Sequence, residues 1–282
     1  MPIVLMTDSA ADYTAKEREE KNIITVPLNV SIGDETFLDG YTIDAEAFYK
    51  KLSEGDYYPK TSQPSPATFL DHFNRAKENG DTVIYIAMSS ALSGTIQAAK
   101  IAQDMAEYEN IYIIDSLLVT PAQRLLVDYV KDLIDKNEPV DEIIKKAEVF
   151  KKRVKVFGMV DTLEYFYKGG RLSAAEAAFG DLVNLKPLVE INPEGKIGAW
   201  GKALGRSRAR KALIKKLEEF PADENYPVLF LHSDAEESCL GFKAKFEAAH
   251  PELKTFDFLA SLGPTVGSHT GPGVVAFTYV KK

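Results

Sequence analysis

The chain reads Val83-Ile-Tyr-Ile-Ala-Met88 and then Ser89-Ser-Ala-Leu-Ser-Gly-Thr95, and this stretch decides the fold. A short, almost entirely apolar run that ends in polar residues is typical of a strand buried on both faces. The next segment, Thr95 to Glu107, is apolar or small at helical spacing, which predicts a helix packed on a sheet. A buried strand, a polar turn and a helix in this order predict an α/β fold with a mostly parallel sheet.

The same order recurs on both sides of this stretch. Ile3–Met6, Ile23–Val30 and Ile111–Ile114 are further apolar runs and predict strands. Ser65-Pro66 and Thr120-Pro121 each place a hydroxyl before a proline, which predicts two helix starts. The first half is therefore expected to be a mostly parallel sheet with helices on both faces.

The second half has a different pattern. Val189–Ile191 and Ile197–Trp200 flank Asn192-Pro-Glu-Gly195, which predicts a hairpin and hence a mixed or antiparallel sheet. A domain boundary is expected near Arg153, between residues 1–153 and 154–282. The other elements expected in this half are strands at Lys155–Val160, Val228–Leu231, Thr255–Leu259 and Val274–Val280, a helix ending at Gly169-Gly170, and a small-residue helix around Ala174–Ala178.

Composition narrows the class of protein. The 282 residues suit two domains of ~150 residues, and 45% hydrophobic with 27% charged residues is ordinary for a globular protein. A net charge of −8 argues against nucleic acid as the main partner. The basic run Lys202–Lys216 is the local exception, and it suits a solvated helix face as well as a binding surface.

Cellular location is predicted from what the sequence does not contain. Cys239 is the only cysteine, so no intramolecular disulfide can form. The opening residues do not have the pattern of a signal peptide, and no apolar stretch approaches the ~20 residues of a membrane-spanning helix. A reducing cytoplasm is the expected location.

The polar segment Ser89–Thr95 is a candidate binding loop, because ligands of open α/β sheets bind beyond the carboxyl ends of the strands. Its hydroxyls and the free N–H groups of the next helix can bind an anion. The loop has no Lys or Arg and no Gly-Lys-Ser/Thr ending, so a carboxylate suits it better than a nucleotide. Ser93 is also well placed merely to cap that helix.

Three further polar segments are candidates. In Thr61–Pro66, Ser65 is the expected helix cap, whereas Thr61 has no such local role. In Gly267–Gly273, three glycines and a proline surround His269, which favours a loop that approaches a ligand closely. In Lys168–Ser173, Arg171 lies between two predicted helices and is available to an anion, although a surface role is equally compatible with this pattern.

Taken together, the motifs resemble those of the DegV family over nearly the whole chain. They occur in the family's order and approximate spacing. A single motif would be weak evidence for the family, but six motifs in the same order are specific to it. The matching segments are Thr7-Asp-Ser-Ala-Ala-Asp12, Thr61-Ser-Gln-Pro-Ser65, Leu92-Ser-Gly-Thr95, Asp161–Tyr165 with Gly169–Ser173, Leu185-Lys-Pro187 and His269–Gly273.

The resemblance implies a two-domain bacterial protein that holds one long-chain fatty acid between its domains, without a cofactor or metal and without catalysis of its own. It further implies a separate ATP-dependent kinase subunit, which converts the acid to acyl phosphate for phospholipid synthesis, and transient contact with a membrane surface. The carboxylate ligands implied are Thr61, Ser93 and His269. The supporting loop residues are Ser62, Gly94, Thr95 and Thr270. We extend this to a kinase or phosphate contact through Arg171 and Arg206.

One segment departs from the family pattern. After Ser116 the family usually continues with small residues and glycines, whereas this chain has Leu117-Leu-Val-Thr-Pro-Ala-Gln123. The bulkier side chains are expected to alter the shape of the lipid tunnel.

Rival functions are weaker. A serine hydrolase built from Ser93, His269 and Asp115 has the right residue types but not the Gly-x-Ser-x-Gly elbow. A phosphotransferase acting alone would need a phosphate-binding loop that the sequence does not contain. A nucleic-acid-binding module would depend on the basic run alone.

Overall fold

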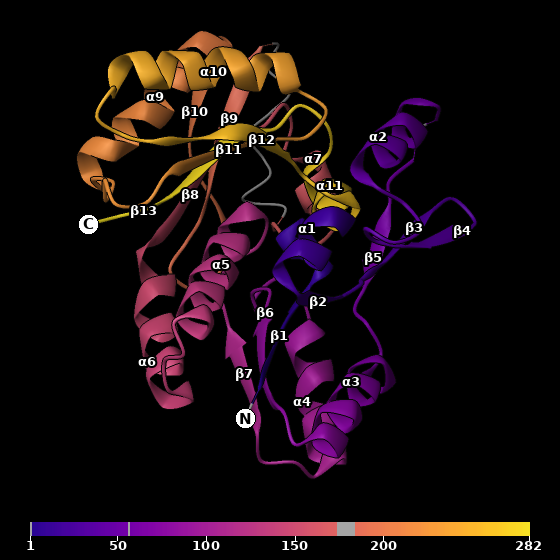
Figure 1. Ribbon diagram of the computed structural model, residues 1–282. Helices are drawn as coiled ribbons and strands as arrows, with labels where there is room; N and C mark the ends of the chain where they lie inside the picture. Colours follow the sequence, from indigo (N-terminus) through magenta and orange to yellow (C-terminus); the bar gives the residue numbers. More distant parts are fainter. Residues whose placement is uncertain (1, 56, 174–183) are drawn as a thin grey trace.

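The computed structural model describes residues 2–55, 57–173 and 184–282. Within them the chain forms a four-stranded, a six-stranded and a three-stranded sheet (Figure 1). The helix expected around Ala174–Ala178 lies outside the described residues. No helix in the described ranges is long and apolar enough to cross a membrane.

The four-stranded sheet is parallel throughout, as predicted. Its order is β2 (Ile23–Val26), β1 (Ile3–Asp8), β6 (Thr82–Ala87) and β7 (Ile111–Asp115). Every residue of β6 is buried, which explains its continuous apolar sequence.

Helices cover both faces of this sheet. Val83 and Tyr85 of β6 pack with α3 (Pro66–Asn79) and α4 (Thr95–Ala106) on one face. Ile84 and Ile86 point to the other face, where α5 (Pro121–Asp135) lies. Short elements at the carboxyl end of β1 complete this region, namely η1 (Ser9–Ala11) and α1 (Ala15–Lys21).

The six-stranded sheet is mixed, and the hairpin prediction is confirmed. Its order is β10 (Ile197–Leu204), β9 (Leu185–Ile191), β8 (Val154–Met159), β13 (Val275–Val280), β11 (Val228–His232) and β12 (Thr255–Ser261). Only the β11–β12 pair is parallel among these described strands. One face is covered by α9 (Gly205–Glu219) and α10 (Glu236–Ala249), with a phenylalanine-rich core beneath them.

The other face of this sheet packs on the first half of the chain. Val156 and Leu231 share one continuous core with Leu126 of α5 and Phe150 at the end of α6 (Val140–Phe150). The short helix η2 (Lys151–Arg153) links α6 to β8, where the boundary between domains was expected. Since one core continues across this point, the division into two domains stays a prediction.

The three-stranded sheet corrects the sequence analysis. It consists of β4 (Glu35–Leu38), β3 (Asn29–Ile32) and β5 (Lys60–Ser62), with α2 (Ala45–Ser53) packed on it. The single strand predicted at Ile23–Val30 is in fact split between β2 and β3, which lie in different sheets. Pro27 separates them, because proline cannot donate to a strand ladder and interrupts the pairing.

The Gly267–Gly273 segment is also corrected. We expected a loop, but residues up to Thr270 belong to α11 (Pro264–Thr270), which packs against α7 (Glu164–Lys168), α2 and β5. Gly267 permits close packing, since an added Cβ there would lie 2.6 Å from the Tyr49 hydroxyl. Gly271 ends the helix with a φ of 67°, a conformation that favours glycine.

Candidate functional site

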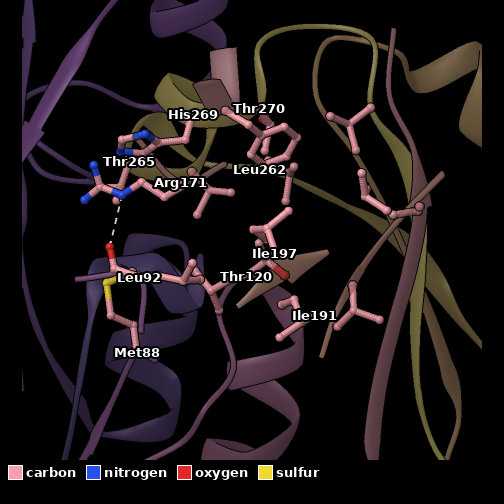
Figure 2. A pocket seen from close by; sticks show the side chains of 18 of the residues that line it. Met88, Leu92, Thr120, Arg171, Ile191, Ile197, Leu262, Thr265, His269 and Thr270 are labelled. Carbon is pink, nitrogen blue, oxygen red and sulfur yellow. Dashed lines mark hydrogen bonds between the residues drawn. The ribbon is translucent and has the colours of Figure 1, made fainter. Parts of the chain in front are cut away.

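An apolar cavity lies between the two larger sheets and under α11. The space between its lining atoms amounts to about 800 Å³, part of which is open to solvent. Both halves of the chain line it, with apolar side chains forming most of the wall (Figure 2). The apolar wall residues include Leu28, Met88, Leu92, Val119, Val156, Val160, Phe166, Val189, Ile191, Ile197, Leu231, Leu262, Val266, Val274 and Ala276.

Polar side chains gather at one part of this wall. Thr61 on β5 and His269 in the last turn of α11 share a hydrogen bond of 2.8 Å between Oγ1 and Nε2, although they are 208 positions apart in the chain. Ser93 and Thr270 line the same cavity. The cavity is therefore lined by all three residues that were expected to bind a carboxylate, Thr61, Ser93 and His269. Their role in binding remains a prediction.

His269 is held in place from behind by Gly169. A Cβ on Gly169 would overlap Nδ1 of the imidazole, so only glycine leaves room for this ring position. Nδ1 is itself buried without a hydrogen-bond partner among the described residues. Burial, and then the positive charge of Arg171, lowers the pKa of His269 to about 4. The ring is therefore neutral at neutral pH.

Arg171 lies in the cavity wall beside His269 (Figure 2). Its Nε donates to the carbonyl of Leu92 at 3.1 Å and its Nη1 to the carbonyl of Gly169 at 2.6 Å. Burial lowers the pKa of this guanidinium. Arg171 places a positive charge beside His269, and this charge favours an anion at that part of the wall. Glu190 also lines the cavity.

Arg206 is not part of this arrangement. Its Nη2 donates to both carboxylate oxygens of Asp161, at 2.9 and 2.8 Å, and its Nη1 donates to the Ser238 hydroxyl at 2.8 Å. The structure thus separates Arg171, in the cavity wall, from Arg206, which does not line the cavity.

Ser93 has two local contacts in addition to its place in the wall. Its Oγ lies 2.8 Å from Oγ1 of Thr95 and accepts from the Thr95 N–H at 3.3 Å. Ser93 therefore contacts the first residue of α4 but is not its N-cap, which is Gly94, and it also lines the cavity.

The supporting loop residues fall into two groups. Thr270 lines the cavity, with its hydroxyl donating to the Gly271 carbonyl at 3.2 Å. Ser62, Gly94 and Thr95 do not line it. Ser62 is exposed and accepts from Asn29 Nδ2 at 3.2 Å, because successive side chains on β5 point to opposite faces.

Gly94 instead allows the two polar loops to approach each other. An added Cβ on Gly94 would overlap the side-chain oxygen of Gln63. This contact brings the segment that follows β6 close to the segment that follows β5.

The residues of the hydrolase alternative do not form a relay. Oδ1 of Asp115 accepts from the backbone N–H groups of Ser90, at 3.2 Å, and Leu117, at 3.1 Å. The imidazole of His269 is bonded to Thr61 rather than to Ser93. Among the described residues, no group of three or more potential metal ligands is found.

The unusual segment Leu117–Gln123 lies against the cavity. Leu117 and Thr120 both have positive φ, 56° and 63°, a conformation that costs about 1–3 kcal/mol for residues other than glycine. The turn of the β9–β10 hairpin contacts this region, with the Gly195 carbonyl accepting from the Ser89 hydroxyl at 2.8 Å. Val119 and Thr120 line the cavity, so the segment does contribute to the wall, as its position in the sequence suggested.

Sequence comparison decides the family. A sequence model described as "Uncharacterised protein, DegV family" matches residues 2–282. The chain belongs to the DegV family. A DegV domain-containing protein of Listeria monocytogenes is 34% identical to it over 98% of each chain.

Solved DegV structures have the same fold. A fatty acid-binding DegV family protein from Thermus thermophilus has a TM-score of 0.89 and 29% identity, covering 100% of both chains. The fatty acid kinase (Fak) B3 protein of Streptococcus pneumoniae, loaded with linoleic acid, has a TM-score of 0.86 and 20% identity, again covering 100% of both chains. This last likeness establishes the shared α/β architecture and no more.

Proposed function

We propose that this DegV protein holds one long-chain fatty acid, with the carboxylate at Thr61, Ser93 and His269 and the alkyl chain in the apolar cavity. The observation that supports this most directly is the hydrogen-bonded Thr61–His269 pair in the wall of a mostly apolar cavity. The fatty acid-binding relative from Thermus thermophilus points to the same class of ligand.

The energetics of the site suit an ionised fatty acid. Burying an alkyl chain contributes about 0.8 kcal/mol per methylene, and the wall offers apolar side chains along most of its surface. Burying a carboxylate costs several kcal/mol unless donors or an opposite charge compensate for it. Hydroxyl groups, a neutral imidazole and the nearby guanidinium of Arg171 offer that compensation.

A role as the binding subunit of a fatty acid kinase is the finer part of this proposal. In it, the protein does not catalyse the reaction but presents the carboxylate to a separate ATP-dependent subunit, which forms the acyl phosphate. The Fak B3 protein of Streptococcus pneumoniae is the relative whose name suggests this role. Arg206, partly exposed and bonded to Asp161, is our candidate for the contact with that subunit.

The first experiment is organic extraction and mass spectrometry of the purified protein, followed by displacement of a fluorescent lipid from Thr61→Val, Ser93→Ala and His269→Ala. Each variant is expected to bind fatty acid at least tenfold more weakly while its circular dichroism is unchanged. Ser62→Ala is the matched control, because Ser62 is adjacent to Thr61 but faces away from the cavity. Wild-type affinity in all three variants would contradict the proposal.

The kinase role has its own test. Arg206→Ala is expected to keep the wild-type lipid affinity and to lower acyl phosphate formation with a fatty acid kinase subunit and ATP. Lys211→Ala, an exposed change on the same helix α9, controls for the loss of one positive charge. Equal turnover for wild type and Arg206→Ala would remove Arg206 from the proposed contact.

A further inference from the structure

The hydroxyl of Thr120 is a polar group in the cavity wall with no partner. Thr120 is 5% exposed, it lines the cavity, and its Oγ1 is buried without a hydrogen bond among the described residues. Figure 2 shows Thr120 near Leu92, Ile191 and Ile197, away from His269. A buried hydroxyl that is left unpaired is unfavourable, so such groups in native proteins call for a specific explanation.

The backbone at Thr120 adds a second, independent observation. Its φ of 63° and ψ of −162° lie in a region that is essentially restricted to glycine. The strained conformation is held by the Thr120 N–H, which donates to the Ala10 carbonyl at 2.9 Å, and by the Gln123 N–H, which donates to the Thr120 carbonyl at 2.9 Å. The chain therefore retains a β-branched hydroxyl residue at a position where glycine would be favoured.

The other hydroxyls along the wall differ from that of Thr120, except for Thr265, whose buried Oγ1 also has no hydrogen bond among the described residues. Thr61 is bonded to His269, Ser93 to Thr95, and Thr270 to the Gly271 carbonyl. Each of these has a protein partner before any ligand binds. Thr120 is different in that its surroundings within the cavity are aliphatic, as drawn in Figure 2.

We propose that the preferred ligand bears an oxygen, as a hydroxyl or keto group, part-way along its alkyl chain, and that the Thr120 hydroxyl hydrogen-bonds to it. This inference rests on the proposed function, because it concerns the tail of the same bound acid. A threonine hydroxyl both donates and accepts, so it suits either form of oxygen. Such a contact discriminates because a ligand without the oxygen leaves the buried hydroxyl unpaired.

The experiment compares acids of equal length in delipidated protein. The dissociation constants of stearic acid, of a series of hydroxystearic acids with the hydroxyl at successive mid-chain carbons, and of the matching ketostearic acids are measured for wild type and Thr120→Val. We expect at least one oxygenated isomer to bind wild type about tenfold more tightly than stearic acid, and this preference to disappear in Thr120→Val.

Two further variants keep the result interpretable. Thr120→Ser keeps the hydroxyl and should keep the preference. Thr36→Val removes an exposed threonine hydroxyl on β4, outside the cavity, and should leave the preference for the oxygenated isomer unchanged. The binding of the hydroxy and keto series separately tells which oxygen is favoured.

The outcomes separate this inference from the proposed function. If wild type binds stearic acid as tightly as every oxygenated isomer, or if Thr120→Val retains the preference, the role of Thr120 is overturned while fatty acid binding stands. If none of the acids binds wild-type protein, the proposed function itself fails, and this inference fails with it.

Discussion

The apolar cavity and a wide cleft both border α11, and burial shifts the pKa values of their ionisable groups in opposite directions. His269 and Thr270, at the end of the helix, line the cavity. Gly263 and Pro264, at its start, line the cleft together with Asp12 and Asp39. The helix thus connects a site that favours an anion to a site that already contains buried carboxyl groups.

Desolvation explains the pKa shifts in both places, because burial disfavours the charged form of a group, whether it is a protonated imidazole or an ionised carboxylate. It lowers the pKa of His269 to about 4, with help from Arg171. It raises the pKa of Asp39 to about 6, and it raises that of Asp12 well above its ordinary value, with help from the like charge of Asp39. The Gly263 N–H donates to Asp12 at 3.0 Å, so these carboxyl groups are in contact with the start of α11.

The two ends therefore make opposite contributions to stability as pH changes. A carboxyl whose pKa is raised on folding stabilises the folded state most below its unfolded pKa, and this contribution is lost as pH rises through the folded pKa. A histidine whose pKa is lowered on folding stabilises the folded state above its unfolded pKa, and this contribution is lost as pH falls through the folded pKa. For Asp39 this contribution is lost as pH rises from 3.8 to about 6. For His269 it is lost as pH falls from 6.5 to about 4.

The two largest expected effects are on stability, and Asp39→Asn gives one of them. Above pH 6 wild type must keep an ionised carboxylate buried, whereas asparagine remains neutral. At about 1.4 kcal/mol per pKa unit, the variant should gain about 3 kcal/mol relative to wild type between pH 3.8 and pH 7.5. Urea unfolding of delipidated protein across this range measures the difference.

The control for this prediction is Asp257→Asn, which removes a carboxylate from an exposed position in the same cleft. A difference between Asp39→Asn and wild type that stays constant with pH would show that Asp39 titrates alike in the folded and unfolded states.

His269→Gln should show the opposite slope, of similar size. Wild type loses stability between pH 6.5 and about 4, because the imidazole takes up a proton in the unfolded state while the buried ring stays neutral. Glutamine does not titrate. The variant should therefore improve relative to wild type by about 3 kcal/mol as pH falls through that window. The same unfolding series measures it, and a relative loss of stability at low pH would contradict the assignment of a neutral imidazole.

Gly169→Ala, which disturbs only the surroundings of His269, is expected to have a smaller effect, and this effect is on fatty acid affinity. The new Cβ would overlap the His269 ring, which must then move away from Thr61. Fatty acid affinity should fall about tenfold, as measured by lipid displacement. Gly170→Ala is the matched control, because that Cβ meets open space although its φ of 71° makes it conformationally costly. Equal affinity in both variants would show that the ring position is unimportant for binding.

The smallest effect is the contribution of Arg171 to the pKa of His269. Burial is the larger cause and Arg171 the smaller one, so Arg171→Met should raise the pKa only partly towards 6.5. NMR titration of the histidine ring protons measures this change. A return to 6.5 in the variant would mean that charge repulsion, rather than burial, keeps the ring neutral.

Much of this architecture follows from patterns that neighbouring residues create. The apolar run of β6 and the polar segment after it predicted a buried parallel strand and a turn, and both are present. The turn at Asn192–Gly195 predicted a hairpin, which the structure confirms. The same local patterns failed where one residue or a distant contact decided the outcome. Pro27 splits one predicted strand between two sheets, and close packing against α2 allows a glycine-rich segment to be helical.

Sequence patterns were enough to predict most of the strands and helices, the family and the polar segments that end at the cavity, because these patterns are set by residues close together in the chain. Three relations could be seen only in the folded protein: Thr61 meets His269, Arg171 lines the cavity while Arg206 does not, and the Thr120 hydroxyl has no hydrogen bond within the described part of the chain. These relations arise when separate elements pack together. Packing brings into contact residues that are far apart in the chain, and their distance in space cannot be read from their spacing in the sequence.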